Sequence, residues 1–190
     1  MKVLHVMLAA VMAAAVPGAA GAADRIEANL TGYQEVPSVS TPAHGEFKAT
    51  IAKDGQSIDY ELSYDDLVGT VQQSHIHFAQ KGVNGSIVIW LCQTATTSAP
   101  DSVKAITPMC PSPGGTVEGH ITSANVIAAV TTSQMIVAGE LGEVIAAIRA
   151  GVAYANVHAT PLNPGGEIRG QLKTSHGHDH DDDHDHDGHK

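Results

Sequence analysis

"EFKATIAKDGQSIDYELSY", residues 46–64, decides the fold class of this chain. Apolar side chains recur at every second position on both sides of a central turn, at Phe47, Ala49 and Ile51 and then at Ile58, Tyr60, Leu62 and Tyr64. A period of two is typical of a strand with one buried face. Asp54-Gly55 is a favoured two-residue turn, because both residues tolerate a positive φ. The stretch therefore predicts an antiparallel β-hairpin.

Short segments with strand character continue along the chain on both sides of this hairpin. Glycine and proline clusters separate them, and the expected strands cover residues 71–78, 86–92, 116–121, 152–158 and 167–172. Strands of this length and spacing are typical of an antiparallel sandwich or barrel. We therefore expect an all-β domain.

One segment has a helical period instead. "GELGEVIAAIRAG", residues 139–151, places Leu141, Val144, Ile145 and Ile148 on one helical face. Acidic residues lie in its first turn, Arg149 lies in its last turn, and Gly151 is suited to end it. We expect this helix to cover one end of the sheet, and a second short helix to start after Thr122 or Ser123.

The two ends of the chain differ from the middle. Residues 1–23 carry Lys2, an apolar run and a small-residue Ala20-Gly21-Ala22 site, which together indicate a signal peptide rather than an anchor helix or a buried helix. Residues 24–175 are expected to form one domain. Residues 176–190 lack apolar side chains and are expected to form a disordered His/Asp-rich tail. We therefore expect an exported protein, periplasmic or secreted, with no membrane span in its mature form.

The charge of the chain limits its partners. The formal net charge is −10 at pH 7. Nucleic-acid binding is disfavoured, because phosphate recognition requires clustered lysine and arginine. Cations, including divalent metal ions, are the more natural partners.

The chain has two cysteines, Cys92 and Cys110. In an exported protein an even number of cysteines indicates a disulfide. The alternative is a pair of thiolate metal ligands, but separated cysteines without a CxxC motif are poor evidence for a zinc site. We expect the two residues to form a disulfide that tethers the polar loop between them.

Two histidines alternate with apolar residues in "QQSHIHF", residues 72–78. In an extended strand Ile76 and Phe78 share the inward face, so His75 and His77 point away from the core. Their Cα atoms would be roughly 7 Å apart, given a rise of ~3.3 Å per residue. Two imidazoles at that spacing can bind one ion, although a full site needs three or four ligands.

A third ligand has to come from another segment. His158, at the end of an expected strand, is the first candidate, His120 is the second and His44 is the third. The alternative is that these histidines are ordinary surface residues. Imidazole ligands without cysteine suit a copper or zinc ion, and ligand type does not choose between the two.

The tail offers a second and different group of histidines. His176, His178, His180, His184, His186 and His189 alternate with aspartates in "HGHDHDDDHDHDGHK". Such ligands can wrap a divalent ion in many equivalent ways, with binding that weakens as histidine is protonated below about pH 6.5. The alternatives are an acidic solubilising tail or an expression tag. We expect the tail to collect metal ions.

Catalytic motifs are not evident in the chain. GxSxG, HExxH and phosphate-loop patterns do not occur in it. "NPGGEIRG", residues 163–170, indicates a tight turn into the last strand rather than a nucleotide loop. Arg169 within it is expected to pair with a carboxylate such as Glu167, or to bind across to a loop.

Three segments, in this order, resemble the CHRD domain family, named after chordin. They are "LTGYQEVPSVSTPAHGEF" (30–47), "SHIHFAQKGVNGSIV" (74–88) and "GVAYANVHATPLNPGGEIRGQL" (151–172). The resemblance implies an immunoglobulin-like or superoxide-dismutase-like antiparallel Greek-key sandwich. It implies little about activity, and in chordin the setting is extracellular protein binding.

The histidine pair is also similar to that of copper-zinc superoxide dismutase, in which an HxH pair and further histidines hold copper. His75, His77 and His158 match such positions. The domain lacks the dense histidine and aspartate loop that holds zinc in that enzyme, and similarity of fold does not transfer function.

Three functions follow from these features. The leading expectation is an exported, non-enzymatic metal-binding protein, with a copper or zinc site on the sandwich and a metal-collecting tail. The first alternative is an extracellular or periplasmic protein-interaction module without a physiological metal. The second alternative is a dismutase-like redox enzyme.

Overall fold

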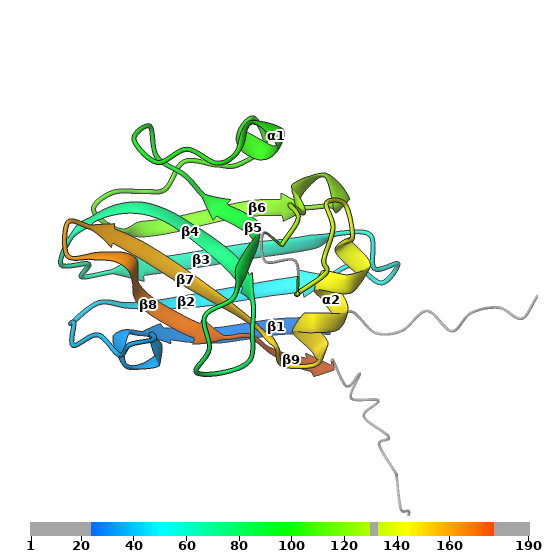
Figure 1. The fold of residues 1–190 in the computed structure, drawn as a ribbon, viewed down its shortest axis with the longest axis horizontal. Coiled ribbons are helices and arrows are strands. Elements are labelled where there is room, and N and C mark those ends of the chain that lie inside the picture. Colours follow the sequence, from blue (N-terminus) through cyan, green and yellow to red (C-terminus); the bar gives the residue numbers. More distant parts are fainter. Residues whose placement is uncertain (1–23, 130–132, 177–190) are drawn as a thin grey trace, which may run out of the picture.

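The expected hairpin forms and belongs to one continuous antiparallel sheet (Figure 1). Its turn is longer than the predicted two residues: the N–H of Ala52 donates to the carbonyl of Ser57 across residues 53–56, and of Asp54 and Gly55 only Gly55 has a positive φ. The computed structural model describes residues 24–129 and 133–176. Within these residues the strands are β1 Asp24–Thr31, β2 His44–Ile51, β3 Ile58–Asp65, β4 Thr70–Phe78, β5 Ser86–Cys92, β6 Gly115–Ile121, β7 Ala153–Thr160, β8 Asn163–Gln171 and β9 Lys173–His176. The helical segments are η1 Gly32–Gln34, α1 Asp101–Lys104, η2 Ser123–Asn125 and α2 Leu141–Arg149.

The strands follow one another in the sheet in the order β5-β4-β7-β8-β1-β2-β3-β6, and β9 pairs with β1. The sheet folds over on itself at β8 and β1, which share a single pairing between Thr31 and Arg169. One layer consists of β5, β4, β7 and β8, and the other of β1, β2, β3 and β6 (Figure 1). Because the chain crosses between layers after β3, β5 and β6, the architecture is the expected all-β sandwich.

The core lies between the two layers. Burial alternates along β1 and β3, as expected for strands with one buried face, and Phe47 and Leu62 are fully buried at its centre. Tyr60 also lies in the core, where its hydroxyl donates to the carbonyl of Leu91 in the opposite layer. The layers are thus joined by apolar packing and by a hydrogen bond.

The predicted helix forms as α2 and packs its apolar face against one end of the sandwich. Leu141, Val144, Ile145 and Ile148 are all buried. The second expected helix is a single 3-10 turn, η2, closed by a reciprocal capping box between Thr122 and Asn125. The short helix α1, which the hydrophobic period did not predict, lies in the loop between Cys92 and Cys110.

The first and last strands of the domain, β1 and β9, pair with each other. Asp24 at the start of β1 pairs in the sheet with His176 at the end of β9, so the backbone of His176 belongs to the sheet rather than to the tail. The expected signal peptide (1–23) and the remainder of the expected tail (177–190) lie outside the described residues. In the part of the chain that is described, no helix is long and apolar enough to cross a membrane.

Cys92 and Cys110 form the predicted disulfide, which closes a loop across a sequence separation of 18 residues. Replacing both cysteines by alanine is expected to lower the free energy of unfolding by about 3 kcal/mol, because the unfolded chain gains freedom. Urea denaturation monitored by circular dichroism measures the change. Met109→Ala, at an exposed neighbouring position, is the control and should cost less than about 0.5 kcal/mol. Equal midpoints for the double variant and the parent would mean that the cross-link does not stabilise the fold.

Candidate metal centre

The pairing of β4 with β7 brings the histidines of two distant segments onto one face. In this register Gln73 lies opposite His158, and His75 lies opposite Asn156. Odd-numbered positions of β4 therefore share a face with even-numbered positions of β7. Ile76 and Val157 point the other way, into the core between the layers. The outer face of the sheet thus carries a continuous row of polar side chains.

His75, His77 and His158 converge on this face. Each contributes one ring nitrogen to a group whose members all lie within 4.8 Å of one another. The Nδ1 atom of His75 and the Nε2 atom of His158 are 3.3 Å apart. Among the described residues, this is the group of three or more potential ligands with the geometry to hold a metal ion. His158, the first candidate for the third ligand, is the one that the fold brings to the pair.

Two backbone carbonyls determine which ring nitrogens carry protons. The Nδ1 atom of His77 donates to the carbonyl of Gly85 at 2.9 Å, and the Nδ1 atom of His158 donates to the carbonyl of Pro164 at 2.9 Å. Because a carbonyl oxygen only accepts, each proton is on Nδ1, and Nε2 of each neutral ring keeps a free lone pair. Metal-binding histidines are commonly oriented by such a bond from their other ring nitrogen.

The histidines are neutral because they are buried. His75 is fully buried, and His77 and His158 are 7% and 6% exposed. Burial lowers the pKa of His77 to about 4 and lowers the pKa of His158. The pKa of His75 lies well below its ordinary value, first through burial and then through its two histidine neighbours. The rings can therefore accept a metal ion without first losing a proton.

This burial corrects the expectation that the histidines occupy the polar, outer face of a half-buried strand. They do point away from Ile76, but a second layer covers them. Loop residues 79–85 cross the outer face of β7 and β8, where Arg169 binds the carbonyls of Gln80 and Val83. Alternation along the strand predicted the direction of the side chains. Their burial depends on this loop, which contacts His77 through Gly85, and on Trp90, which packs against His75.

Two buried ring nitrogens lack hydrogen-bond partners among the described residues, namely Nε2 of His75 and Nε2 of His77. A buried polar atom without a partner costs free energy, and such atoms are uncommon in folded proteins. A metal ion bound by the histidines would satisfy such lone pairs. The donor set and its unpaired atoms therefore fit a metal ion.

Aromatic side chains hold the imidazole rings in place. Trp90 on β5 meets His75 edge to face, with ring centroids 4.3 Å apart. Tyr154 stacks in parallel on His77 at 4.7 Å, and the Arg169 guanidinium lies 3.3 Å from the centre of the tyrosine ring. This packing limits the rotation of the imidazoles and keeps water from them.

A buried carboxyl group lies beside the centre, and the sequence patterns did not single it out. Burial raises the pKa of Glu35 to about 7, while Arg169, the backbone of Val36 and the side chain of Asn156 act to lower it. Asn156 was missed as well. It stands between Tyr154 and His158 in the segment "YANVH", so its place on the histidine face follows from strand alternation alone.

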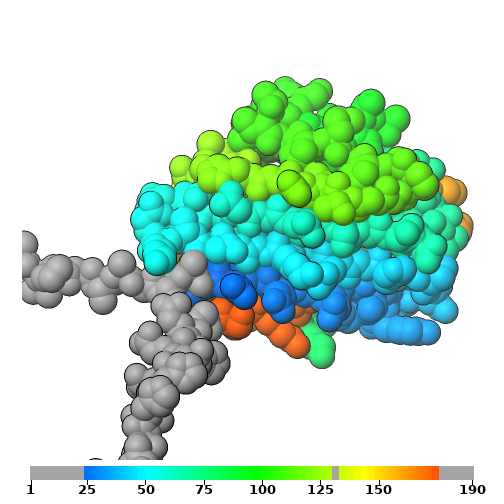
Figure 2. Space-filling model, turned by 180° about the vertical axis from the view of Figure 1, so that it is seen from behind, coloured from blue at the N-terminus to red at the C-terminus, as the bar shows by residue number. Residues whose placement is uncertain are grey.

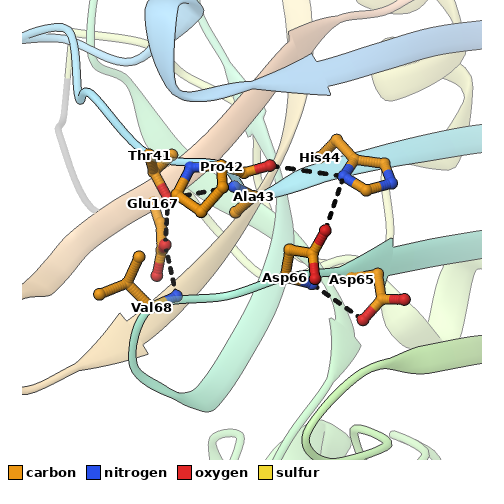
Figure 3. Close-up of polar contacts among 8 residues, drawn as sticks. All are labelled: Thr41, Pro42, Ala43, His44, Asp65, Asp66, Val68 and Glu167. Atoms are coloured by element: carbon orange, nitrogen blue, oxygen red, sulfur yellow. Dashed lines mark hydrogen bonds and ion pairs between the residues drawn. The ribbon is translucent and has the colours of Figure 1, made fainter.

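The other candidate histidines of the domain lie elsewhere. His120 on β6 is exposed and pairs with Asp59, 2.6 Å away, on the outer face of the opposite layer. His44 is exposed at the start of β2, 3.9 Å from Asp66 (Figure 3). Neither joins the group formed by His75, His77 and His158.

Among the described residues Arg169 does not form an ion pair with Glu167, so Glu167 is not the carboxylate that the first expectation named; the carboxyl group that acts on Arg169 is that of Glu35. Arg169 binds across to the loop, as the second expectation held. Glu167 instead accepts hydrogen bonds from the hydroxyl of Thr41 at 2.6 Å and the backbone N–H of Val68 at 2.8 Å (Figure 3). Glu167 thereby joins two loops, and Arg169 secures the loop over the histidines.

The pH dependence of stability tests the buried state of these groups in metal-free protein. For His77 the unfolded chain binds a proton below about pH 6.5 and the folded chain only below about 4, so stability falls as pH falls through this window. Glu35 has the opposite sign. Its folded pKa of about 7 exceeds its ordinary 4.5, so stability rises as pH falls from about 7 to 4.5.

We expect His77→Gln to flatten the loss of stability between pH 6.5 and 4 by about 3 kcal/mol, and Glu35→Gln to steepen it by a similar amount. Urea unfolding at a series of pH values, with a chelator present, measures both changes. Leu162→Gln, at an exposed site without a titratable group, is the control and should leave the profile unchanged. Parallel profiles for all variants would contradict the assigned protonation states.

In the comparison with protein families, residues 26–172 match the model of the CHRD domain. The matched region runs from β1 to the residue after β8 and includes every side chain of the candidate centre. Searches of curated proteins and of solved structures found no match to the chain.

Proposed function

The chain belongs to the CHRD domain family, and we propose that it is an exported protein that binds a copper or zinc ion through His75, His77 and His158, without catalysing a reaction. CHRD domains are extracellular modules of a protein-interaction type. The observation that carries the metal proposal is the convergence of three buried, neutral imidazoles, two of them oriented by backbone carbonyls.

Export is supported by three features. The family is extracellular, the Cys92–Cys110 disulfide suits an oxidising compartment, and the sequence predicts a signal peptide over residues 1–23. Retention in a periplasm and release are both compatible with these features. The proposal therefore places the centre where exchange of metal ions with the surroundings is possible.

Copper and zinc are the ions that the donor set favours. Imidazole suits both ions. Thiolate ligands, which would favour iron–sulfur clusters or other soft-metal sites, are not part of the group. The cysteines that could have supplied thiolates are cross-linked to each other. When bound, such an ion would supply a positive charge among lone pairs that otherwise have no partner.

The tail is proposed as a second, looser site. Its histidines, from His176 onward, are expected to collect divalent ions with little selectivity. An acidic tail would also raise the local concentration of cations by electrostatic attraction. The domain and the tail would then differ in how rigidly their ligands are held.

A protein-interaction module is the second candidate. The layer formed by β1, β2, β3 and β6 presents an uncovered outer face, visible in Figure 2. Its exposed side chains include the charged residues Arg25, Glu27, Lys48, Asp59, Glu61 and Glu118. Replacing these charged residues by alanine, with the histidines intact, should weaken binding of a protein partner and leave metal binding unchanged.

Titration of the purified protein with copper and zinc tests the centre in the domain. The tail histidines from His176 onward are first replaced by serine, so that they do not compete. Trp90 is the single tryptophan of the chain and lies against His75, so its fluorescence reports binding. His75→Ala and His158→Ala are each expected to weaken binding on the order of 100-fold or more, because one of three ligands is lost.

His44→Ala and His120→Ala are the matched controls, since both histidines lie outside the group. They should leave the affinity within about twofold. Failure of the parent protein to bind either ion more tightly than micromolar would reject the proposal. An assay for superoxide consumption by the copper-loaded protein separates a binding role from dismutase-like chemistry.

The pH of the titration separates the domain from the tail. Exposed tail histidines are expected to lose their ions as the pH falls through about 6.5. The buried histidines stay neutral to lower pH, since burial lowers their pKa. Equilibrium dialysis at pH 7.5 and 5.5 should show that only the ions added by the tail are released. Equal release from the protein with and without tail histidines would contradict this division.

A further inference from the structure

A fourth polar side chain faces the three histidines from the middle of β7. Asn156 lies directly opposite His75 in the sheet and is 2% exposed. Its side-chain oxygen, Oδ1, is 3.1 Å from Nε2 of His158. Its side chain also interacts with His77. The amide therefore contacts the centre from β7, the same strand as His158.

The contact with His158 joins two acceptors. The single ring proton of neutral His158 is on Nδ1, where it is donated to the carbonyl of Pro164. Nε2 and the amide oxygen thus present lone pairs to each other across 3.1 Å. In the metal-free protein Nδ1 of His75, 3.3 Å away, can donate its proton to Nε2 of His158, but this leaves the two acceptors facing each other. A positive charge beside the two atoms would make the arrangement favourable.

The surroundings of the amide fix its orientation. The amide nitrogen and the Glu35 carboxylate both lie beside Gly166, and the side chains of Glu35 and Asn156 are hydrogen-bonded. A side chain at position 166 would overlap the Glu35 carboxylate, and the φ of Gly166 is +129°. The carboxylate is an acceptor, so it favours the amide nitrogen on its side and the amide oxygen toward His158.

Other neighbours of the histidines do not offer a ligand atom in this position. The Trp90 indole has an N–H that only donates. The Tyr154 hydroxyl lies 3.5 Å from the backbone nitrogen of Gly85, beyond the stacked His77 ring. Within the described residues, Asn156 is the side chain with an oxygen acceptor at hydrogen-bond distance from a histidine of the group.

We infer that the amide oxygen of Asn156 is the fourth ligand atom of the centre and that it favours divalent copper or zinc over monovalent copper. The inference rests on the proposed function. Three imidazoles bind monovalent and divalent copper, whereas a carbonyl oxygen is a harder donor that suits the divalent ions. Four donors also match the coordination number that zinc prefers.

The test compares affinities for Zn²⁺, Cu²⁺ and Cu⁺ in the full chain whose tail histidines are replaced by serine. Competition with chromophoric chelators, followed by Trp90 fluorescence, gives each affinity. Asn156→Leu removes the oxygen and should weaken the two divalent ions by about 10- to 100-fold, a loss typical of groups around a metal. Its effect on Cu⁺ should be less than about threefold.

Asn156→Asp gives a prediction of the opposite sign. It keeps an oxygen at the same position and adds a negative charge, so the preference for Zn²⁺ over Cu⁺ should increase relative to the parent. Should the leucine variant not fold, the aspartate variant alone decides. The matched control is Gln73→Leu, an amide-to-leucine change opposite His158 in the register, which should leave the preference unchanged.

A spectroscopic measurement separates a ligand from a residue that only supports the fold. Electron paramagnetic resonance of the Cu²⁺ form should show a change in coordination for Asn156→Leu and not for Gln73→Leu. Equal losses for Cu⁺ and the divalent ions, with an unchanged spectrum, would overturn the inference and leave the proposed three-histidine site intact. Absence of binding in the parent protein would reject both.

Discussion

β4 and β7 pair in a register that sets His75 opposite Asn156, and the candidate centre depends on this pairing. A strand turns its side chains alternately to opposite faces. A shift of one residue in either strand would therefore exchange the polar and apolar faces. A shift of β4 would turn His75 and His77 into the core and Ile76 outward, and a shift of β7 would turn His158 inward and Val157 outward. Core packing and the metal centre thus require the same register, so apolar burial holds the ligands in place.

The second requirement is the cover over the histidine face. Loop residues 79–85 lie across the sheet because Arg169 donates to their carbonyls and stacks on Tyr154. The same loop supplies the carbonyl of Gly85 that orients His77. Arg169 therefore secures the loop, and the loop determines both the burial and the tautomer of a ligand. Arg169 thus influences the geometry of the centre through the loop, without being one of its proposed ligands.

The centre contains a conflict that has consequences for stability. Buried, neutral imidazoles with unpaired nitrogens reduce the stability of the metal-free protein, and His77 does so increasingly as pH falls. Binding of an ion to the folded state would offset this cost by mass action. A fold stabilised by an apolar core, a disulfide and an aligned sheet can tolerate such a site. The inward side chains of β7, such as Val157, contribute to the apolar core. This stabilisation allows the outward side chains of the same strand to be polar and available for binding.

The strands, the main helix and the CHRD resemblance could all be predicted from the sequence, because alternation, turn residues and motifs are local. The same alternation predicted that His75 and His77 share a face, and the place of His158 at a strand end made it the first candidate for the third ligand. Neither the alternation nor the position of His158 at a strand end shows how far apart β4 and β7 lie in the fold. The separation of His120 from the centre, the burial of the histidines and the roles of Asn156 and Glu35 depend on contacts between residues far apart in the chain. Local periodicity determined the direction of each side chain, whereas strand order and a covering loop decided which of those side chains meet, because pairing and burial are properties of the folded sheet.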